Sequence, residues 1–240
     1  FTVKEFRSRY RASILGLLWT VLLPLATVFA LGFMLFFISR ANPREWGAAF
    51  LGGYLAWSLM LTATSIAVGS IVANSVYVSR IYAPKGIFPL SAFLVGAVEF
   101  VAFFFAVSLL LVCMGGTIYP TFALLPLATL VYAPFVLGCC YLLAVANVFW
   151  RDTTFIWAAL STLWFFFTPI LYPITAVPAQ YRPLFEANPL YPFVLLFQNI
   201  FLGTVPPAEL WITAMIIGVL TLAVGASLFR RNEERFYLYL

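Results

Sequence analysis

Of the 240 residues, 64% are hydrophobic, 19% are aromatic and only 9% are charged, and the net charge is +5. A soluble domain carries roughly 25% charged residues, and a water-facing surface cannot be covered with far fewer. This composition excludes a soluble globular enzyme. The low charge and high aromatic content also exclude a disordered or nucleic-acid-binding chain. The solvent of this protein is therefore lipid.

The first segment, residues 1–15, is predicted to be an amphipathic helix in the membrane interface. It carries two stripes at helical spacing, an apolar one of Val3, Phe6, Tyr10 and Ile14 and a basic one of Lys4, Arg7 and Arg11. A basic face of this kind suits anionic lipid headgroups. A solvated basic flank before the first membrane span is the alternative.

Six apolar runs follow, and each is long enough for a membrane-spanning helix of roughly 20 residues. The predicted spans are about 16–39, 48–73, 88–114, 122–147, 154–172 and 209–229. Glycine and proline mark the breaks between them. The predicted fold is a single all-α transmembrane domain of six helices over residues 1–240.

The stretch 173–208 between the fifth and sixth spans does not fit simple span counting. It contains seven prolines, at positions 173, 178, 183, 189, 192, 206 and 207, with apolar residues between them. The run 193–202 is too short to cross a bilayer and is typical of a re-entrant or interfacial helix. We therefore expect short gate helices at the external end.

Basic residues in the loops predict the orientation. With the N-terminus inside, ten lie on the cytoplasmic side: Lys4, Arg7, Arg9, Arg11, Arg80, Lys85, Arg151, Arg230, Arg231 and Arg235. The external side then holds Arg40, Arg44 and Arg182. This asymmetry places both termini in the cytoplasm.

The sequence lacks the residue clusters of an enzyme or a metal site. It contains no histidine, its eight acidic residues are scattered, and its three cysteines lie inside apolar runs. Catalysis or metal binding needs such groups together. Glu99 is the one carboxylate well inside an apolar run, and an intramembrane acid is a functional candidate by default. Bracing of a helix contact is the structural alternative for Glu99, and the favoured one.

Small residues recur every fourth position in the second span, at Ser65, Gly69 and Ala73. Small side chains at this interval let two helices approach closely. Packing inside the helix bundle is the favoured interpretation, and a contact between subunits is the alternative.

Aromatic residues gather in and after the fifth span: Trp157, Trp164, Phe165, Phe166, Phe167 and Tyr172. Membrane-interface belts and lipid contacts explain most aromatic residues of membrane proteins. Three phenylalanines that follow a tryptophan cover every face of a helix, so some of them point inward. A stacking surface for the apolar C–H faces of sugar rings is the second hypothesis.

Two segments on the predicted cytoplasmic side could dock a partner. In residues 74–88, one edge of a short helix would be apolar, with Arg80 and Lys85 exposed. The apolar edge consists of Val76, Tyr77, Ile81 and Tyr82. The second segment is the loop 147–152, with the sequence Asn-Val-Phe-Trp-Arg-Asp. Such faces are docking surfaces if they do not fold against the bundle.

Four stretches, in this order and spacing, resemble the permeases of bacterial polysaccharide ABC exporters, which belong to the type-2 ABC transporter superfamily. They are Arg9-Tyr10-Arg11-Ala12-Ser13-Ile14-Leu15-Gly16-Leu17-Leu18-Trp19 followed by Pro24, the loop Asn147–Asp152, Phe167-Thr168-Pro169-Ile170, and Asn188-Pro189-Leu190-Tyr191-Pro192. The resemblance covers nearly the whole chain. These permeases are the membrane subunits of O-antigen, capsule and wall teichoic acid exporters.

The resemblance implies a homodimer in the bacterial cytoplasmic (inner) membrane that pairs with two cytoplasmic ABC ATPase subunits. ATP and Mg²⁺ would bind the partner, this chain would hold no cofactor or metal, and the cargo would be an undecaprenyl-linked glycan. The implied ATPase-coupling residues are Tyr77, Arg80, Tyr82, Phe149, Arg151 and Asp152. The implied substrate pathway is Trp19, Phe29, Trp164, Phe165, Phe166 and Phe167, and the implied gate is Tyr172, Asn188 and Tyr191.

Other classes of protein remain as alternatives. The nearest is a type-2 ABC exporter of another lipid, teichoic acid or a drug. A secondary transporter or channel would need internal repeats and intramembrane charges besides Glu99. A membrane glycosyltransferase would need an acid–base cluster. We therefore expect an ATP-driven permease subunit that moves a lipid-linked polysaccharide outward.

Overall fold

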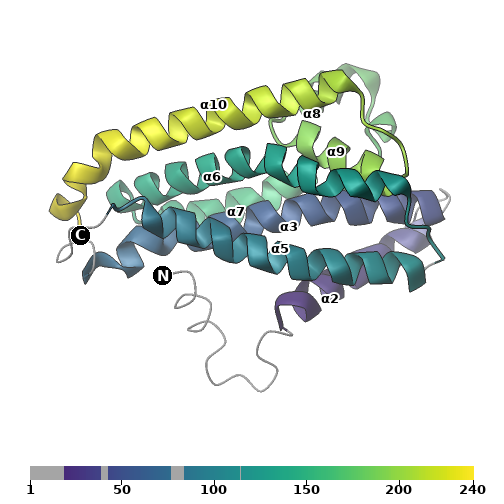
Figure 1. Cartoon of the computed structure of the whole chain (residues 1–240), viewed down its shortest axis with the longest axis horizontal. Helices are drawn as coiled ribbons and strands as arrows, with labels where there is room; N and C mark the ends of the chain where they lie inside the picture. Colours follow the sequence, from purple (N-terminus) through teal and green to yellow (C-terminus); the bar gives the residue numbers. More distant parts are fainter. Residues whose placement is uncertain (1–18, 39–42, 77–83, 114) are drawn as a thin grey trace.

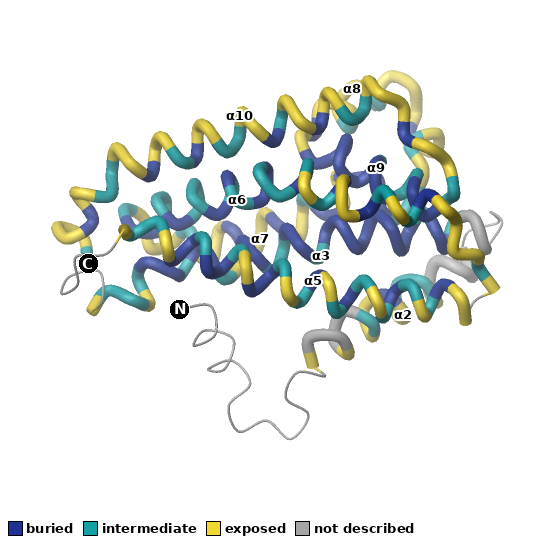
Figure 2. Tube along the Cα trace, viewed as in Figure 1, coloured by how far each residue is buried: buried dark blue, intermediate teal, exposed yellow. Residues whose placement is uncertain are grey.

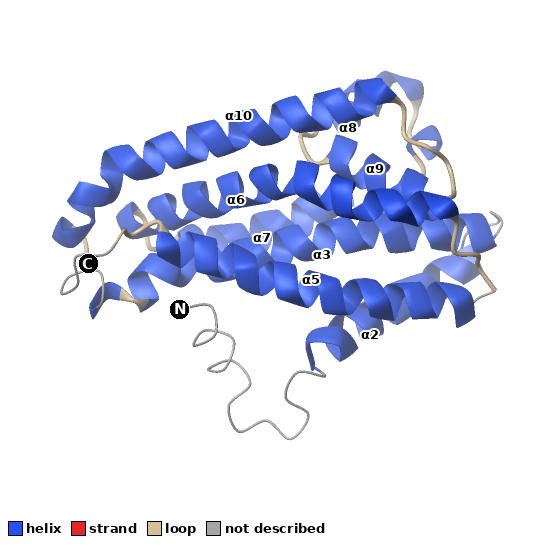
Figure 3. Ribbon diagram, viewed as in Figure 1, coloured by secondary structure: helices blue, strands red, loops and turns tan. Residues whose placement is uncertain are grey.

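The computed structural model describes residues 19–38, 43–76, 84–113 and 115–240, and in this part of the chain it contains helices and no strand (Figure 3). The long helices are α2 (Trp19–Ile38), α3 (Pro43–Ala73), α5 (Ile87–Cys113), α6 (Leu125–Phe149) and α10 (Ala208–Asn232). Shorter α-helices are α7 (Thr153–Phe166), α8 (Arg182–Glu186) and α9 (Tyr191–Phe201). The 3₁₀ turns are η2 (Pro120–Leu124), η3 (Ile174–Ala176), η4 (Ala179–Tyr181) and η5 (Glu233–Leu238).

The helices lie side by side and form an elongated bundle with two distinct ends (Figure 1). The loop end carries η2, η3, η4, α8 and α9, and the opposite end carries the start of α5 and the ends of α6 and α10. Helix α3 occupies the centre and contacts α2, α5, α6, α7 and α9.

Four stretches are long and apolar enough to cross a membrane: Trp46–Ala73, Ile87–Cys113, Pro120–Phe149 and Ala208–Leu238. They correspond to the second, third, fourth and sixth predicted spans. Helix α2 is a 20-residue apolar helix inside the first predicted span. The count of six spans stays a prediction.

The fifth predicted span, 154–172, is wrong in its extent. Helix α7 ends at Phe166 and has 14 residues, which at about 1.5 Å per residue covers only part of a bilayer core. Its last turn tightens where the Thr168 N–H donates to the Phe165 carbonyl. Pro169 then follows, and proline has no N–H to continue a helix and restricts the residue before it. A prediction made from the length of the uncharged apolar run alone therefore extends this helix too far.

Several helices approach one another closely at glycines. A Cβ at Gly138 of α6 would lie 2.6 Å from the Thr221 backbone of α10, and one at Gly225 would lie 2.5 Å from the Gly138 carbonyl oxygen. A Cβ at Gly52 of α3 would lie 2.7 Å from the Phe197 carbonyl oxygen of α9. Small residues thus bring these backbones together, as is usual in membrane bundles.

The predicted small-residue stripe of the second span does not serve this purpose. Ser65 and Ala73 are exposed, and in the described part of the chain nothing lies within 4 Å of a Cβ built on Gly69. The interpretation of this stripe as packing inside the bundle is therefore wrong. Spacing alone cannot say which face of a helix is covered, and α3 turns this stripe outward.

Figure 2 shows the buried residues on the inner faces of the helices and the exposed residues on the outer faces. The exposed residues of α5 and α10 are mostly apolar. On α5 the exposed residues follow helical spacing: Leu94, Val98, Val101, Phe105, Leu109 and Val112. On α10 the large apolar residues among the exposed ones are Ile212, Met215, Ile216, Val219, Leu220, Val224 and Leu228. A water-facing surface would carry charges at such positions, so these faces suit lipid or another apolar chain.

Two predicted features lie outside the described residues. These are the interfacial helix over 1–15 and the middle of the segment 74–88, which includes Tyr77, Arg80 and Tyr82. The predictions for them stay predictions.

Candidate functional site

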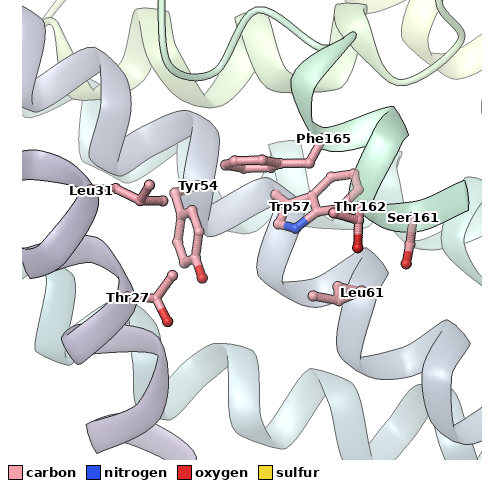
Figure 4. A pocket seen from close by; sticks show the side chains of 8 residues that line it. All are labelled: Thr27, Leu31, Tyr54, Trp57, Leu61, Ser161, Thr162 and Phe165. Carbon is pink, nitrogen blue, oxygen red and sulfur yellow. The ribbon is translucent and has the colours of Figure 1, made fainter. Parts of the chain in front are cut away.

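A partly open cavity of about 180 Å³ lies among α2, α3 and α7 (Figure 4). Each of the three helices contributes side chains at helical spacing. The lining residues are Thr27 and Leu31 of α2, Tyr54, Trp57 and Leu61 of α3, and Ser161, Thr162 and Phe165 of α7. The cavity exists because α2 and α7 both lean on α3 and leave space between them.

Three aromatic rings form the wall of this cavity. The Phe165 ring lies 5.2 Å from the Trp57 ring and 6.1 Å from the Tyr54 ring, measured between centroids. The Tyr54 hydroxyl shares a side-chain hydrogen bond with Thr27. Aromatic faces and hydroxyl groups bind a ligand noncovalently. The described lining combines aromatic rings, leucines and hydroxyl groups, and such a lining suits noncovalent binding of a ligand.

The two tryptophans of α7 are held in fixed orientations. The Trp157 Nε1–H donates to the Thr64 hydroxyl oxygen at 3.2 Å, and the Trp164 Nε1–H donates to Asn188 Oδ1 at 2.8 Å. Their rings meet edge to face with centroids 6.0 Å apart. Both indoles are thus preorganised, which lowers the entropy lost when a side chain contacts a ligand.

Asn188 is the centre of a polar network where α7 ends. Its Oδ1 accepts from the Trp164 indole and from the Leu190 backbone N–H at 3.0 Å. Its Nδ2 donates to Thr168 Oγ1 at 2.9 Å and to the Phe167 carbonyl at 3.3 Å. Because Asn188 is only 9% exposed, this network connects α7 rigidly to the turn before α9.

The residues of the predicted substrate pathway do not lie together. Phe165 alone of them lines the cavity, while Trp164 is partly buried against Asn188. Phe166 and Phe167 are 54% and 55% exposed, so they point away from the core. Trp19 and Phe29 of α2 are also exposed and outside the lining. The pathway set is therefore not one surface within a single chain.

Sequence reasoning missed Tyr54 and Trp57 on α3. They stand at positions i and i+3, with Leu61 at i+7, so they share one helix face. That spacing was readable from the sequence. It did not stand out because apolar residues occupy every face of the second span.

The predicted gate residues all lie at the loop end of the bundle. The Tyr172 hydroxyl donates to the Phe166 carbonyl at 2.6 Å, and its ring meets Phe185 edge to face. Tyr191 begins α9 and is buried; this burial, with a further contribution from Glu186, raises the pKa of its phenol. Tyr191 therefore stays neutral at physiological pH.

A second, wider cavity of about 470 Å³ lies in this same region. Its lining includes Phe167, Tyr172, Val177, Tyr181 and Phe185. The short helices α8 and η4 build one wall. Arg182, the first residue of α8, is bonded to the η3 region through donation from its guanidinium to the Val177 and Thr175 carbonyls. The loop end therefore presents an aromatic surface built on short helices; the predicted role of these helices as a gate stays a prediction.

The second predicted coupling segment forms a tight turn between α6 and α7. Buried Asn147 accepts a hydrogen bond from the Thr154 hydroxyl at 3.0 Å, which closes the turn. Asp152 is exposed and precedes α7. Arg151 is also exposed, and its guanidinium donates to the Tyr239 carbonyl at 2.8 Å. Phe149 packs against Tyr239 with centroids 4.8 Å apart.

Glu99 lies near the middle of α5 and is half-buried. The neighbouring Phe100 faces the core, and Val98 is exposed. Its position between the two surfaces fits either role considered for it, and both remain predictions.

Comparison with known proteins gives a consistent assignment. The family model described as "ABC-2 type transporter" matches residues 1–202. The O-antigen export system permease protein RfbA of Myxococcus xanthus is 31% identical over 243 residues, which cover 97% of this chain and 91% of that protein. A protein of the same name from Klebsiella pneumoniae is 24% identical over 98% of this chain and 91% of its own length.

Proposed function

Since the chain belongs to the ABC-2 type transporter family, we propose that it is the membrane-spanning permease subunit of an ATP-driven exporter. The cargo is a lipid-linked polysaccharide of the O-antigen kind, carried on undecaprenyl. The subunit provides the passage and hydrolyses no ATP itself. ATP and Mg²⁺ bind the two cytoplasmic ATPase subunits, and this chain holds no cofactor or metal.

The observation that carries this proposal is the 31% identity with an O-antigen export permease along almost the entire chain. The cavity lined by Tyr54, Trp57 and Phe165 supports the substrate class. A polysaccharide has apolar C–H faces and many hydroxyl groups, and aromatic rings beside hydroxyls suit both. Because stacking does not select one sugar, such a lining also lets successive residues pass.

The distribution of charge supports an inner-membrane protein with both termini in the cytoplasm. Seven lysines and arginines fall within the described residues, and five of them lie at the end where α5 begins: Lys85, Arg151, Arg230, Arg231 and Arg235. Arg44 and Arg182 lie at the loop end. By the positive-inside rule, the first end is cytoplasmic and the loop end is external. The coupling residues then face the ATPase.

A homodimer fits the exposed surfaces of α3 and α7. The stripe of Ser65, Gly69 and Ala73 is left open by the described bundle, and small residues of this kind permit close contact with a second copy. Two copies would bring the exposed Phe166 and Phe167 of each subunit toward a shared passage. Closure of the ATPase subunits would then shift the two bundles between an inward-open and an outward-open state.

The test is complementation of a bacterial strain whose own O-antigen permease has been deleted. The chain is expressed with its ABC ATPase partner, and O-antigen at the cell surface is measured by antibody binding to intact cells. We expect export that needs both subunits and an intact ATP site in the partner. Export of a different lipid or of a drug, with no surface O-antigen, would contradict the assigned cargo.

Replacement of Phe165 tests the role of the cavity in export. We expect Phe165→Leu, which keeps an apolar side chain but removes the ring, to lower the export rate about two- to tenfold. Phe105→Ala on the outer face of α5, where Phe105 is 66% exposed, is the control and should leave export unchanged. Equal rates for Phe165→Leu and the original chain, at equal membrane abundance, would remove this cavity from the pathway.

A further inference from the structure

The segment after α10 packs back against the described end of the first predicted coupling segment, at Lys85 and Phe88, and against the second. It consists of η5 and the two residues that follow, 233–240, and most of its side chains are exposed, including Tyr237 at 65% and Leu238 at 64%. Phe236 is the exception, because none of its surface is exposed. One fully buried ring in an otherwise exposed segment indicates an anchor.

Phe236 inserts where four long helices meet. It belongs to a separate apolar cluster at this end of the bundle, which we call the end cluster. Its buried members are Ile71 of α3, Phe88 of α5, Ala144 and Val148 of α6, Phe229 of α10 and Phe236 itself. The Phe236 ring lies 5.3 Å from the Phe229 ring and 6.2 Å from the Phe149 ring.

Polar contacts attach the same segment to each coupling segment. From the first, Lys85 Nζ donates to the Glu233 carbonyl and lies 5.9 Å above the Phe236 ring. From the second, the Arg151 guanidinium donates to the Tyr239 carbonyl at 2.8 Å, and the Phe149 ring packs on Tyr239. Among the described residues, the segment 233–239 therefore contacts both coupling segments, through Lys85 of the first and through Phe149 and Arg151 of the second.

We propose that Phe236, with residues 233–239, is a positioning element that fixes the two coupling segments to one another and to the ends of α6 and α10. The inference rests on the proposed function, in which an ATPase subunit acts at this end. A displacement of either segment then moves both helices as one body, because packed cores shift between discrete arrangements and do not deform continuously. Without Phe236, movement of the ATPase would displace the coupling segments without displacing the ends of α6 and α10.

The test measures coupling in the complete complex, reconstituted in vesicles with an ABC ATPase that supports export by the unmodified chain. Two quantities are recorded: ATP hydrolysed, and polysaccharide exported. For Phe236→Ala we expect normal association with the ATPase, continued ATP hydrolysis, and about two- to thirtyfold less export per ATP. Tyr237→Ala, at the adjacent exposed position, is the matched control and should keep the original ratio.

A second pair of variants keeps the test valid if Phe236→Ala does not fold. Lys85→Met and Arg151→Met each remove one polar contact and leave the end cluster intact. Each should lower export per ATP, and Arg151→Lys, which restores a cationic donor, should recover part of it. A general loss of folding would lower abundance and would not change this ratio.

Other results would overturn the inference. An unchanged ratio in Phe236→Ala, Lys85→Met and Arg151→Met would show that the segment positions nothing. Loss of ATPase association in Tyr237→Ala would show that the segment is itself a docking surface. If the unmodified chain neither binds an ATPase nor exports, the proposed function fails first, and this inference falls with it.

Discussion

Asn188 shows how one side chain can organise a site. It uses its oxygen for two donors and its nitrogen for two acceptors, so it ties the Trp164 indole, the end of α7 and the turn into α9 to each other. A carboxylate of the same shape could not donate to Thr168 or Phe167, and an apolar residue could do neither. An amide is therefore the residue type that this position requires.

Replacement of Asn188 should loosen α7 at its C-terminal end. In Asn188→Ala the Trp164 and Leu190 N–H groups lose their acceptor, and each partly buried donor left alone costs about 1–3 kcal/mol. We expect a lower midpoint of thermal unfolding in detergent and reduced export. Asn199→Ala, which removes a hydrogen bond from Thr204 at an exposed turn, is the control. Equal losses in the two variants would contradict this role.

At the scale of the element, glycines decide which helices touch. Gly138 and Gly225 let α6 and α10 meet backbone to backbone, and Gly52 does the same for α3 and α9. Helix α9 is short, yet most of its residues are buried, so it fills part of the interior at the loop end of the bundle. The stripe of Ser65, Gly69 and Ala73 also consists of small residues, but no described atom lies within 4 Å of a Cβ built on Gly69.

Two alanine substitutions distinguish these positions. Gly225→Ala places a methyl group 2.5 Å from the Gly138 carbonyl oxygen, so we expect a destabilisation of about 1–3 kcal/mol, measured as loss of folded protein on heating in detergent. Gly69→Ala meets no described atom within 4 Å and should leave the stability of the single chain unchanged. A large effect at Gly69 and none at Gly225 would mean that the two glycines have the opposite roles.

At the scale of the whole molecule, the bundle separates two chemically different ends. One end gathers basic residues and the end cluster, and the other gathers aromatic residues on short helices. The partly open cavity lies among α2, α3 and α7. The two ends therefore match the two roles proposed for them, ATPase coupling at the basic end and cargo exit at the loop end.

The orientation can be tested with single cysteines. In a chain with Cys113, Cys139 and Cys140 replaced by alanine, Gln180→Cys in η4 and Glu234→Cys in η5 place one thiol at each end. A membrane-impermeant maleimide should label only Gln180→Cys on intact spheroplasts and both variants after permeabilisation. Labelling of Glu234→Cys alone on intact spheroplasts would mean that the orientation is inverted.

The sequence by itself determined that the protein lies in lipid, that it is helical, and where four of its long apolar helices run. These properties follow from local composition, because a bilayer requires continuous apolar runs whose backbone is satisfied within each segment. The prolines of 173–208 likewise predicted short helices, and the four motifs pointed to the ABC-2 family, which the comparisons confirm.

Only the tertiary structure decided which residues face one another. It ended α7 at Phe166, turned the Gly69 stripe outward, and placed Tyr54 and Trp57 beside Phe165. It also brought Phe236 under both coupling segments. In a chain that is apolar on every helix face, hydrophobic periodicity is too weak to mark the inner side. The partners of each face are then set by close packing at glycines and by a few buried hydrogen bonds.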